Sequence, residues 1–115
     1  MKALPWIAVV AAMALCARSP AFAADAQLVA HGQAVFATWC APCHGPGPGH
    51  PGTVALGAKY KGAVPAELER RTDLPAPYIG TVVRHGVSVM PIFRKTEVSD
   101  ADLAAIEAYL RRNAD

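Results

Sequence analysis

Two cysteines and a histidine stand together in the stretch "TWCAPCHG": Cys40, Cys43 and His44. A disulfide between the two cysteines would close a loop too small to stabilise a fold appreciably. A thioredoxin-like thiol pair requires a βαβ setting, whereas the hydrophobic pattern of this chain is helical. The spacing C-x-x-C followed at once by His is typical of covalent haem attachment.

Covalent attachment would use these three side chains in two ways. Thiols three residues apart each form a thioether with one vinyl group at the haem edge, so Cys40 and Cys43 are predicted to bind the cofactor covalently. The adjacent His44 then lies under the iron and becomes its proximal ligand. The motif therefore predicts one covalently bound haem c.

Residues 1–23 have the layout of a secretory signal peptide. Lys2 precedes an apolar run, and the segment closes with Ala-Phe-Ala, which suits a signal peptidase. The run is interrupted by a proline and by Arg18, and it is shorter than the ~20 residues of a membrane-spanning helix. We expect cleavage near Ala23, and a domain over 24–115 that acts in the periplasm without a stable membrane anchor.

Removal of this leader leaves a neutral chain. The full sequence has 11 Lys and Arg against 9 Asp and Glu, and the leader holds Lys2 and Arg18 but no acidic residue. A formally neutral remainder argues against a nucleic-acid partner. The remainder keeps only the two cysteines of the motif and a single methionine, Met90.

The hydrophobic periodicity predicts helices joined by loops, with no strand pattern. Helices are expected over 26–40, 65–71, 77–85 and 100–112, and loops over 45–64 and 86–98. Asp25 and Ser99 are predicted to cap the first and last helices, and Gly86 to end the third. The last helix carries an apolar stripe that is expected to be buried: Leu103, Ile106, Tyr109 and Leu110.

The haem iron has a sixth position, for which the chain offers Met90, His85, His31 and His50. Met90 precedes Pro91 in a helix-free stretch that can lean over the distal face. His85 is at a helix C-terminus, where a histidine is stabilised for ordinary electrostatic reasons. His31 is expected to face solvent, and His50 to lie on the proximal side. These considerations favour Met90 and leave His85 as the alternative.

Residues 25–115 resemble class I c-type cytochromes. The resemblance rests on "GQAVFATWCAPCHG", on the Met-Pro pair in the second loop and on "SDADLAAIEAYL" near the end. It implies an all-α class I cytochrome c fold, in which the N- and C-terminal helices cross and loops enclose the haem. Gly32 is then expected at the crossing, with Phe36 and Tyr109 packed beside it.

The same resemblance implies ligands for the iron, His44 on the proximal side and Met90 on the distal side. A proline carbonyl is expected to accept the Nδ1 proton of His44, with Pro51 as first candidate and Pro48 as second. The stretch "RTDLPAPYIGTVVRHGVSVMPIF" is also similar to the small cytochrome subunit of p-cresol methylhydroxylase-type flavocytochromes.

Two protein ligands on the iron leave no position for a substrate, so the expected function is single-electron transfer rather than catalysis. The expected partners are redox proteins, namely a periplasmic flavoprotein dehydrogenase and a downstream cytochrome or oxidase. The alternatives are a haem sensor or haem enzyme with a labile distal ligand, and a haem-free thiol oxidoreductase. The haem pocket is expected to have an apolar wall made of Phe36, Leu56, Tyr78, Val82, Phe93, Leu103 and Ile106.

The partner is expected to dock at the haem edge through an apolar patch. The patch is predicted to contain Ala41, Pro42, Pro46 and the loop 87–92. Charged side chains are expected only at its rim: Arg84, Arg94 and Lys95.

Overall fold

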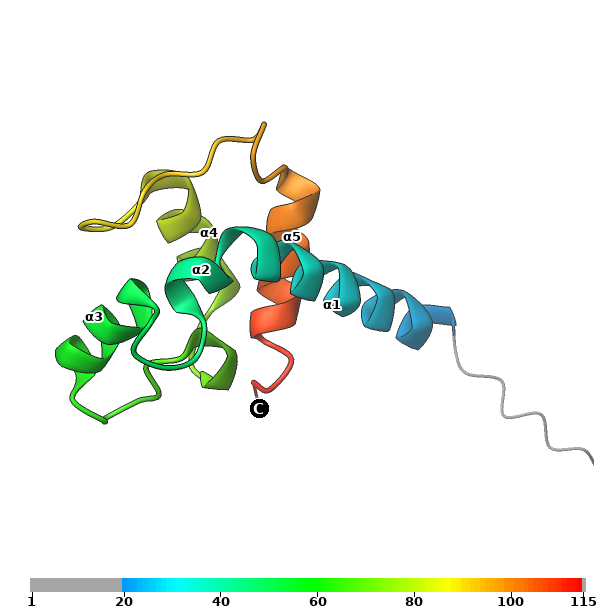
Figure 1. Ribbon diagram of the computed structural model, residues 1–115. Helices are drawn as coiled ribbons and strands as arrows, with labels where there is room; N and C mark the ends of the chain where they lie inside the picture. Colours follow the sequence, from blue (N-terminus) through cyan, green and yellow to red (C-terminus); the bar gives the residue numbers. More distant parts are fainter. Residues whose placement is uncertain (1–19, 115) are drawn as a thin grey trace, which may run out of the picture.

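Five α-helices and one 3₁₀ turn form the part of the chain that the computed structural model describes, residues 20–114 (Figure 1). The elements are α1 (Pro20–Trp39), α2 (Ala41–His44), α3 (Pro51–Tyr60), η1 (Leu68–Arg70), α4 (Ala76–His85) and α5 (Asp100–Leu110). Within this part of the chain the only β pairing is an isolated bridge between Val87 and Met90. The predicted all-α class is confirmed.

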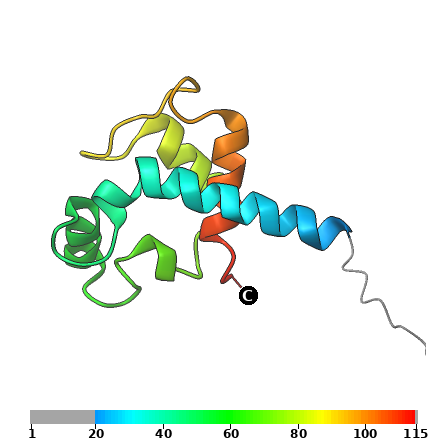
Figure 2. The ribbon, with the colours of Figure 1, turned by 45° about the vertical axis from the view of Figure 1, so that its right-hand side comes forward.

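The first and last helices, α1 and α5, cross each other at Gly32 (Figures 1 and 2). A Cβ atom on Gly32 would lie 1.9 Å from the carbonyl oxygen of Ala105 and 2.8 Å from Cβ of Tyr109. One turn further along α1, Phe36 packs against Tyr109 with ring centroids 5.6 Å apart. The crossing that the resemblance implied is therefore present. It is possible because Gly32 has no side chain, so the two helix backbones can approach each other closely.

The predicted end of α4 and the predicted cap of α5 are also present, whereas α5 ends at Leu110, two residues earlier than expected. Ser99 accepts a hydrogen bond from the backbone N–H of Asp102 at 3.0 Å, and the Asp102 carboxylate accepts one from the N–H of Ser99 at 3.2 Å. This reciprocal pair satisfies two backbone donors at the start of α5. Helix α4 begins after Pro75 and ends at Gly86, whose φ of 69° favours glycine.

Helix α1 begins earlier than predicted. It starts at Pro20, so Asp25 lies inside the helix and does not cap it. The preceding stretch "PAFAA" sustains a helix because alanine has the highest helix propensity and proline is tolerated in a first turn. This first part of α1 extends beyond the other helices (Figure 2), and its described side chains are exposed. The predicted leader lies mostly outside the described residues, and its expected cleavage site falls within α1.

Helix α3 occupies a segment that was predicted to be loop. Within the predicted loop, 45–50 and 61–64 are irregular, and α3 forms between them because Pro51 has the φ that a first helical residue needs and alanine, leucine and lysine follow it. Lys61 ends the helix in a left-handed conformation, φ 49°. Of the helix predicted over 65–71, only the single turn η1 forms. In so short a segment, few hydrogen bonds compensate for the conformational entropy lost when its residues become ordered.

We predict that Gly32→Ala destabilises the protein by about 3 kcal/mol, because α1 and α5 must separate to accept the new methyl group. Urea unfolding followed by circular dichroism measures this. The matched control is Gly57→Ala in α3, where the nearest atom to the new Cβ, that of Ala66, is 3.7 Å away. The control should keep or slightly raise stability. Equal stability losses in both variants would show that the crossing does not require glycine.

Candidate functional site

The cysteine–histidine motif lies where α1 ends: Cys40 separates α1 from α2, and Cys43 and His44 belong to α2. The N–H of Cys40 donates to the carbonyl of Phe36 at 2.8 Å, which continues α1, and the N–H of His44 donates to the carbonyl of Cys40 at 2.8 Å. Helical spacing therefore places Cys40 and His44 on one face of the turn, with Cys43 beside them. Both cysteines are free thiols, and all three side chains line the same cavity.

That cavity has a volume of about 450 Å³, within the usual range for small-molecule and cofactor sites. Its lining is mainly apolar and comes from all five α-helices, η1, the segment 71–75 and the loop 86–99. Six residues of the predicted apolar wall line it: Phe36, Leu56, Tyr78, Val82, Phe93 and Ile106. The seventh, Leu103, does not, because it lies on the side of α5 that faces Gly80 of α4.

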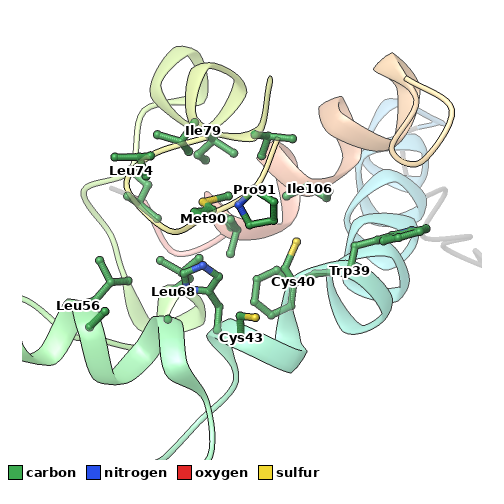
Figure 3. A pocket seen from close by; sticks show the side chains of 18 of the residues that line it. Trp39, Cys40, Cys43, Leu56, Leu68, Leu74, Ile79, Met90, Pro91 and Ile106 are labelled. Carbon is green, nitrogen blue, oxygen red and sulfur yellow. The ribbon is translucent and has the colours of Figure 1, made fainter. Parts of the chain in front are cut away.

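Met90 reaches this cavity from the opposite direction. Figure 3 shows Met90 and Pro91 above the cavity and Cys43 below it. Met90 closes a tight turn with Val87, in which the N–H of Met90 donates to the carbonyl of Val87 at 2.9 Å. A Cβ at Gly86 would lie 2.6 Å from the carbonyl oxygen of Met90, so this turn also depends on a glycine. The structure thus brings the four predicted site residues to one cavity.

Arg84 of α4 fixes the segment that follows Met90 by hydrogen bonds. The Arg84 guanidinium donates to the carbonyls of Phe93 at 3.0 Å and Val98 at 2.8 Å, and it pairs with Asp100 at 2.9 Å. A backbone bond from the N–H of Phe93 to the carbonyl of Val83, 2.9 Å long, fixes the same segment. These bonds hold the returning arm of the loop against α4 and α5.

The other three histidines lie away from the cavity. His31 is exposed, and its Nε2 is 2.7 Å from a carboxylate oxygen of Asp102. His85 is exposed at the end of α4 and borders a shallow surface hollow with Arg84. His50 packs beside Gly45, on the segment that follows the motif. None of the three lines the cavity that holds the two thiols.

The proline carbonyl predicted to pair with His44 does not do so. The Nδ1 atom of His44 is buried and has no hydrogen-bond partner, and burial lowers the pKa of the imidazole. Pro51 is the first residue of α3, where a carbonyl points along the helix axis toward the next turn. Pro48 lies in the irregular segment before it. The His44 ring packs instead against Gly52, where an added Cβ would lie 2.7 Å from Cε1 and 2.9 Å from Nδ1.

The thiol of Cys40 has a property that does not suit disulfide exchange. Burial, and secondarily Cys43, raises the pKa of Cys40 to about 11. Redox-active C-x-x-C pairs depend on a lowered pKa, because the thiolate is the nucleophile. The first cysteine of this motif is protonated at neutral pH, which weighs against the haem-free thiol oxidoreductase.

Several residues that line the cavity were not predicted to belong to its wall. Leu68, Leu74, Ile79, Val83, Val98 and Leu110 extend the apolar wall, and Lys59, Tyr60 and Arg71 add a polar corner. Helical periodicity marks the apolar side chains as core but does not distinguish a core that surrounds a cavity from a filled one. The polar corner has no sequence signature, because it joins the end of α3 to the segment after η1.

The residues around the cavity fit a covalently bound haem. Two unpaired thiols and an imidazole with a partnerless Nδ1 lie on one side, a thioether lies on the other, and apolar side chains line the space between. These are the side chains that hold haem c in proteins, and the lining suits an apolar macrocycle. Cys40 and Cys43 would form the thioethers, and His44 and Met90 would be the axial ligands.

The helices of this structure lie within residues 20–114. None of the helices in this part of the chain combines the length and the apolar composition required to cross a bilayer.

Comparison with known families agrees with this geometry. The family model described as "Cytochrome C oxidase, cbb3-type, subunit III" matches residues 27–110, which run from α1 to the end of α5 and include the whole cavity. No curated protein and no solved structure matches the chain significantly. The matched region covers most of the sequence. The chain therefore belongs to this family of cbb3-type cytochrome c domains, which are class I c-type cytochromes, and it is a haem-containing electron-transfer protein.

Proposed function

We propose that this chain is a periplasmic carrier of single electrons that holds one covalently attached haem c between His44 and Met90. The observation that carries the proposal is the convergence of Cys40, Cys43, His44 and Met90 on one apolar cavity. The haem, when bound, supplies a one-electron change between ferrous and ferric iron. The protein supplies attachment, two axial ligands and an environment of low polarity.

The side chains of the cavity influence the redox equilibrium directly. The neutral thioether of Met90 favours the ferrous state, so ligation by His and Met raises the reduction potential. The apolar lining acts in the same direction, because a medium of low polarity disfavours the additional positive charge of the ferric centre. Arg84 contributes by holding the arm of the loop that follows Met90.

Maturation in a host with the haem c attachment machinery tests the proposal. We expect one haem per chain that survives denaturation, a low-spin spectrum in both oxidation states and reversible one-electron reduction. A high-spin spectrum would favour the alternative of a haem sensor or haem enzyme with a labile distal ligand. A protein without haem absorbance whose two thiols cycle with a disulfide would contradict the proposal.

We predict that Met90→Ala lowers the reduction potential by on the order of 0.1 V, a fraction of the ~0.8 V range that axial ligands span. Water or an imidazole would replace the thioether, and both stabilise ferric iron better. His85→Ala is the matched control and should change the potential much less, because His85 lies outside the cavity. Loss of the low-spin spectrum in the His85 variant alone would reverse the ligand assignment.

Export is part of the proposal. The signal-peptide layout of residues 1–23 supports it, and Ala21, Ala23 and Asp25 near the expected cleavage site are exposed. Cleavage near Ala23 would leave Gly32 and the rest of the crossing intact. The proposed electron donor is a periplasmic dehydrogenase, such as a flavoprotein, and the proposed acceptor is a downstream cytochrome or oxidase.

Exposed apolar side chains on the loop that bears Met90 support an apolar docking patch for these redox proteins. The loop that bears Met90 presents Val87, Val89 and Ile92, and Val89 is 91 % exposed. The basic side chains predicted at the rim pair locally: Lys95 with Asp100 at 2.7 Å, Arg84 with Asp100 at 2.9 Å and Arg94 with Glu97 at 3.3 Å. Basic groups already paired in this way attract an acidic partner only weakly.

We predict that Val89→Gln slows electron transfer to the physiological partner by roughly tenfold, as expected for a central interface residue. The matched control is Val54→Gln on α3, an exposed valine that does not line the cavity. Stopped-flow rates at several ionic strengths should show weak salt dependence. A steep decrease of rate with added salt, or a larger effect of Arg94→Ala than of Val89→Gln, would assign recognition to the basic rim.

A further inference from the structure

Trp39, the last residue of α1, lies both in the wall of the cavity and at the protein surface. It is 41 % exposed, and the next residue is Cys40, one of the two thiols that would attach the haem. Figure 3 shows Trp39 beside Cys40, at the end of the cavity opposite Leu56. Because Trp39 adjoins the attachment point, whatever its ring contacts is coupled in position to that edge of the haem.

The ring of Trp39 contacts Phe93, on the arm of the loop that follows Met90. The two ring centroids are 6.2 Å apart and the ring planes meet at 78°, which is the edge-to-face arrangement that aromatic pairs prefer. Phe93 is half-buried and lines the same cavity. The aromatic pair therefore joins the end of α1 to the loop that bears the proposed distal ligand.

This contact differs from the hydrogen bonds that hold the loop. Within the described part of the chain, the hydrogen bonds of 86–98 stay inside the loop or reach α4 and Asp100, and none of them reaches α1. The N–H of Phe93 donates to the carbonyl of Val83, and the carbonyl of Phe93 accepts from Arg84, so both bonds fix this backbone to α4. The aromatic pair thus links the loop to the helix that ends at the thiols.

The position of Phe93 limits the freedom of Met90. Only Pro91 and Ile92 separate these two residues, and the ring of Pro91 fixes its own φ. On its other side Met90 is held by the turn with Val87, in which each residue donates its N–H to the carbonyl of the other. A ring held in place at Phe93 therefore restricts how far the Met90 side chain can move away from the cavity.

We propose that Trp39 is a positioning residue for the distal ligand: its contact with Phe93 holds the loop closed and keeps the Met90 thioether at the iron. The inference rests on the proposed function, since it requires a haem ligated by Met90. A loop that withdraws its sulfur exposes the sixth position, so the fraction of open molecules determines how tightly an external ligand binds there. Loss of an aromatic pair of this geometry should raise the open fraction about threefold to tenfold.

The test measures how readily added imidazole displaces Met90 from the ferric, haem-loaded protein at neutral pH. The readout is the loss of the sulfur-to-iron charge-transfer band, which reports the bond between Met90 and the iron. We expect Trp39→Leu to lower the imidazole concentration at half displacement about threefold to tenfold. Trp39→Phe keeps an aromatic ring beside Phe93 and should restore most of the wild-type value.

Leu28→Ala is the matched control for the loss of an apolar side chain from α1. Leu28 is 40 % exposed, on the same helix as Trp39, and does not line the cavity. This control should keep the wild-type half-displacement concentration. Phe93→Leu should have at least the effect of Trp39→Leu, and the two changes together should fall short of the product of their separate effects, because either one removes the same contact.

A Met90→Ala background separates positioning of the loop from direct contact between Trp39 and the added imidazole. Without a thioether to displace, the affinity for imidazole no longer depends on how firmly the loop holds Met90 at the iron. Trp39→Leu should therefore change this affinity less than about twofold in the Met90→Ala background, compared with about threefold to tenfold in the presence of Met90.

Two results would overturn the positioning role and leave the proposed function standing. One is an equal half-displacement concentration in Trp39→Leu and the wild type, and the other is an effect of Trp39→Leu that is just as large in the Met90→Ala background. If Trp39→Leu does not incorporate haem, the same comparisons with Phe93→Leu decide the question. Absence of haem, or of the sulfur-to-iron band, in the wild type would instead refute the proposed function.

Discussion

The close approach of α1 and α5 at Gly32 is the contact on which the rest of this structure depends. Cys40 directly follows the last residue of α1, and α5 presents Ile106 and Leu110 to the same cavity. Because both helices are rigid over several turns, the distance between them at the crossing determines how wide the cavity is further along. A methyl group at the crossing would alter the cavity as well as the stability of the pair.

The core and the wall of the cavity are largely the same side chains. Seven of the nine buried apolar residues also line the cavity: Phe36, Leu74, Ile79, Val83, Val98, Ile106 and Leu110. A hollow of about 450 Å³ that stayed empty would forfeit packing energy on the order of 10 kcal/mol, comparable with the 5–15 kcal/mol that stabilises a whole domain. The stability of this fold is therefore coupled to the group that fills the hollow.

Two arginines serve the cavity from different positions. Arg84 binds backbone carbonyls on the arm that follows Met90, and so limits the freedom of the loop that bears the distal side chain. Arg71 is buried in the wall and presents its charge to the cavity itself. Hydrogen bonds to backbone carbonyls or to aspartate compensate each guanidinium for the hydration it loses in its position.

The sequence by itself determined the helical class, the caps at Ser99 and Gly86 and the motif of Cys40, Cys43 and His44, because each depends on neighbours within a few residues. Local patterns did not predict α3, where a favourable first proline outweighed the surrounding glycines. Nor did they reveal that Leu103 faces away from the cavity, or that no proline carbonyl reaches His44. Those features, and the burial of Arg71 in the wall of the cavity, were decided by tertiary structure, since only the packing of distant helices sets which faces enclose a common space.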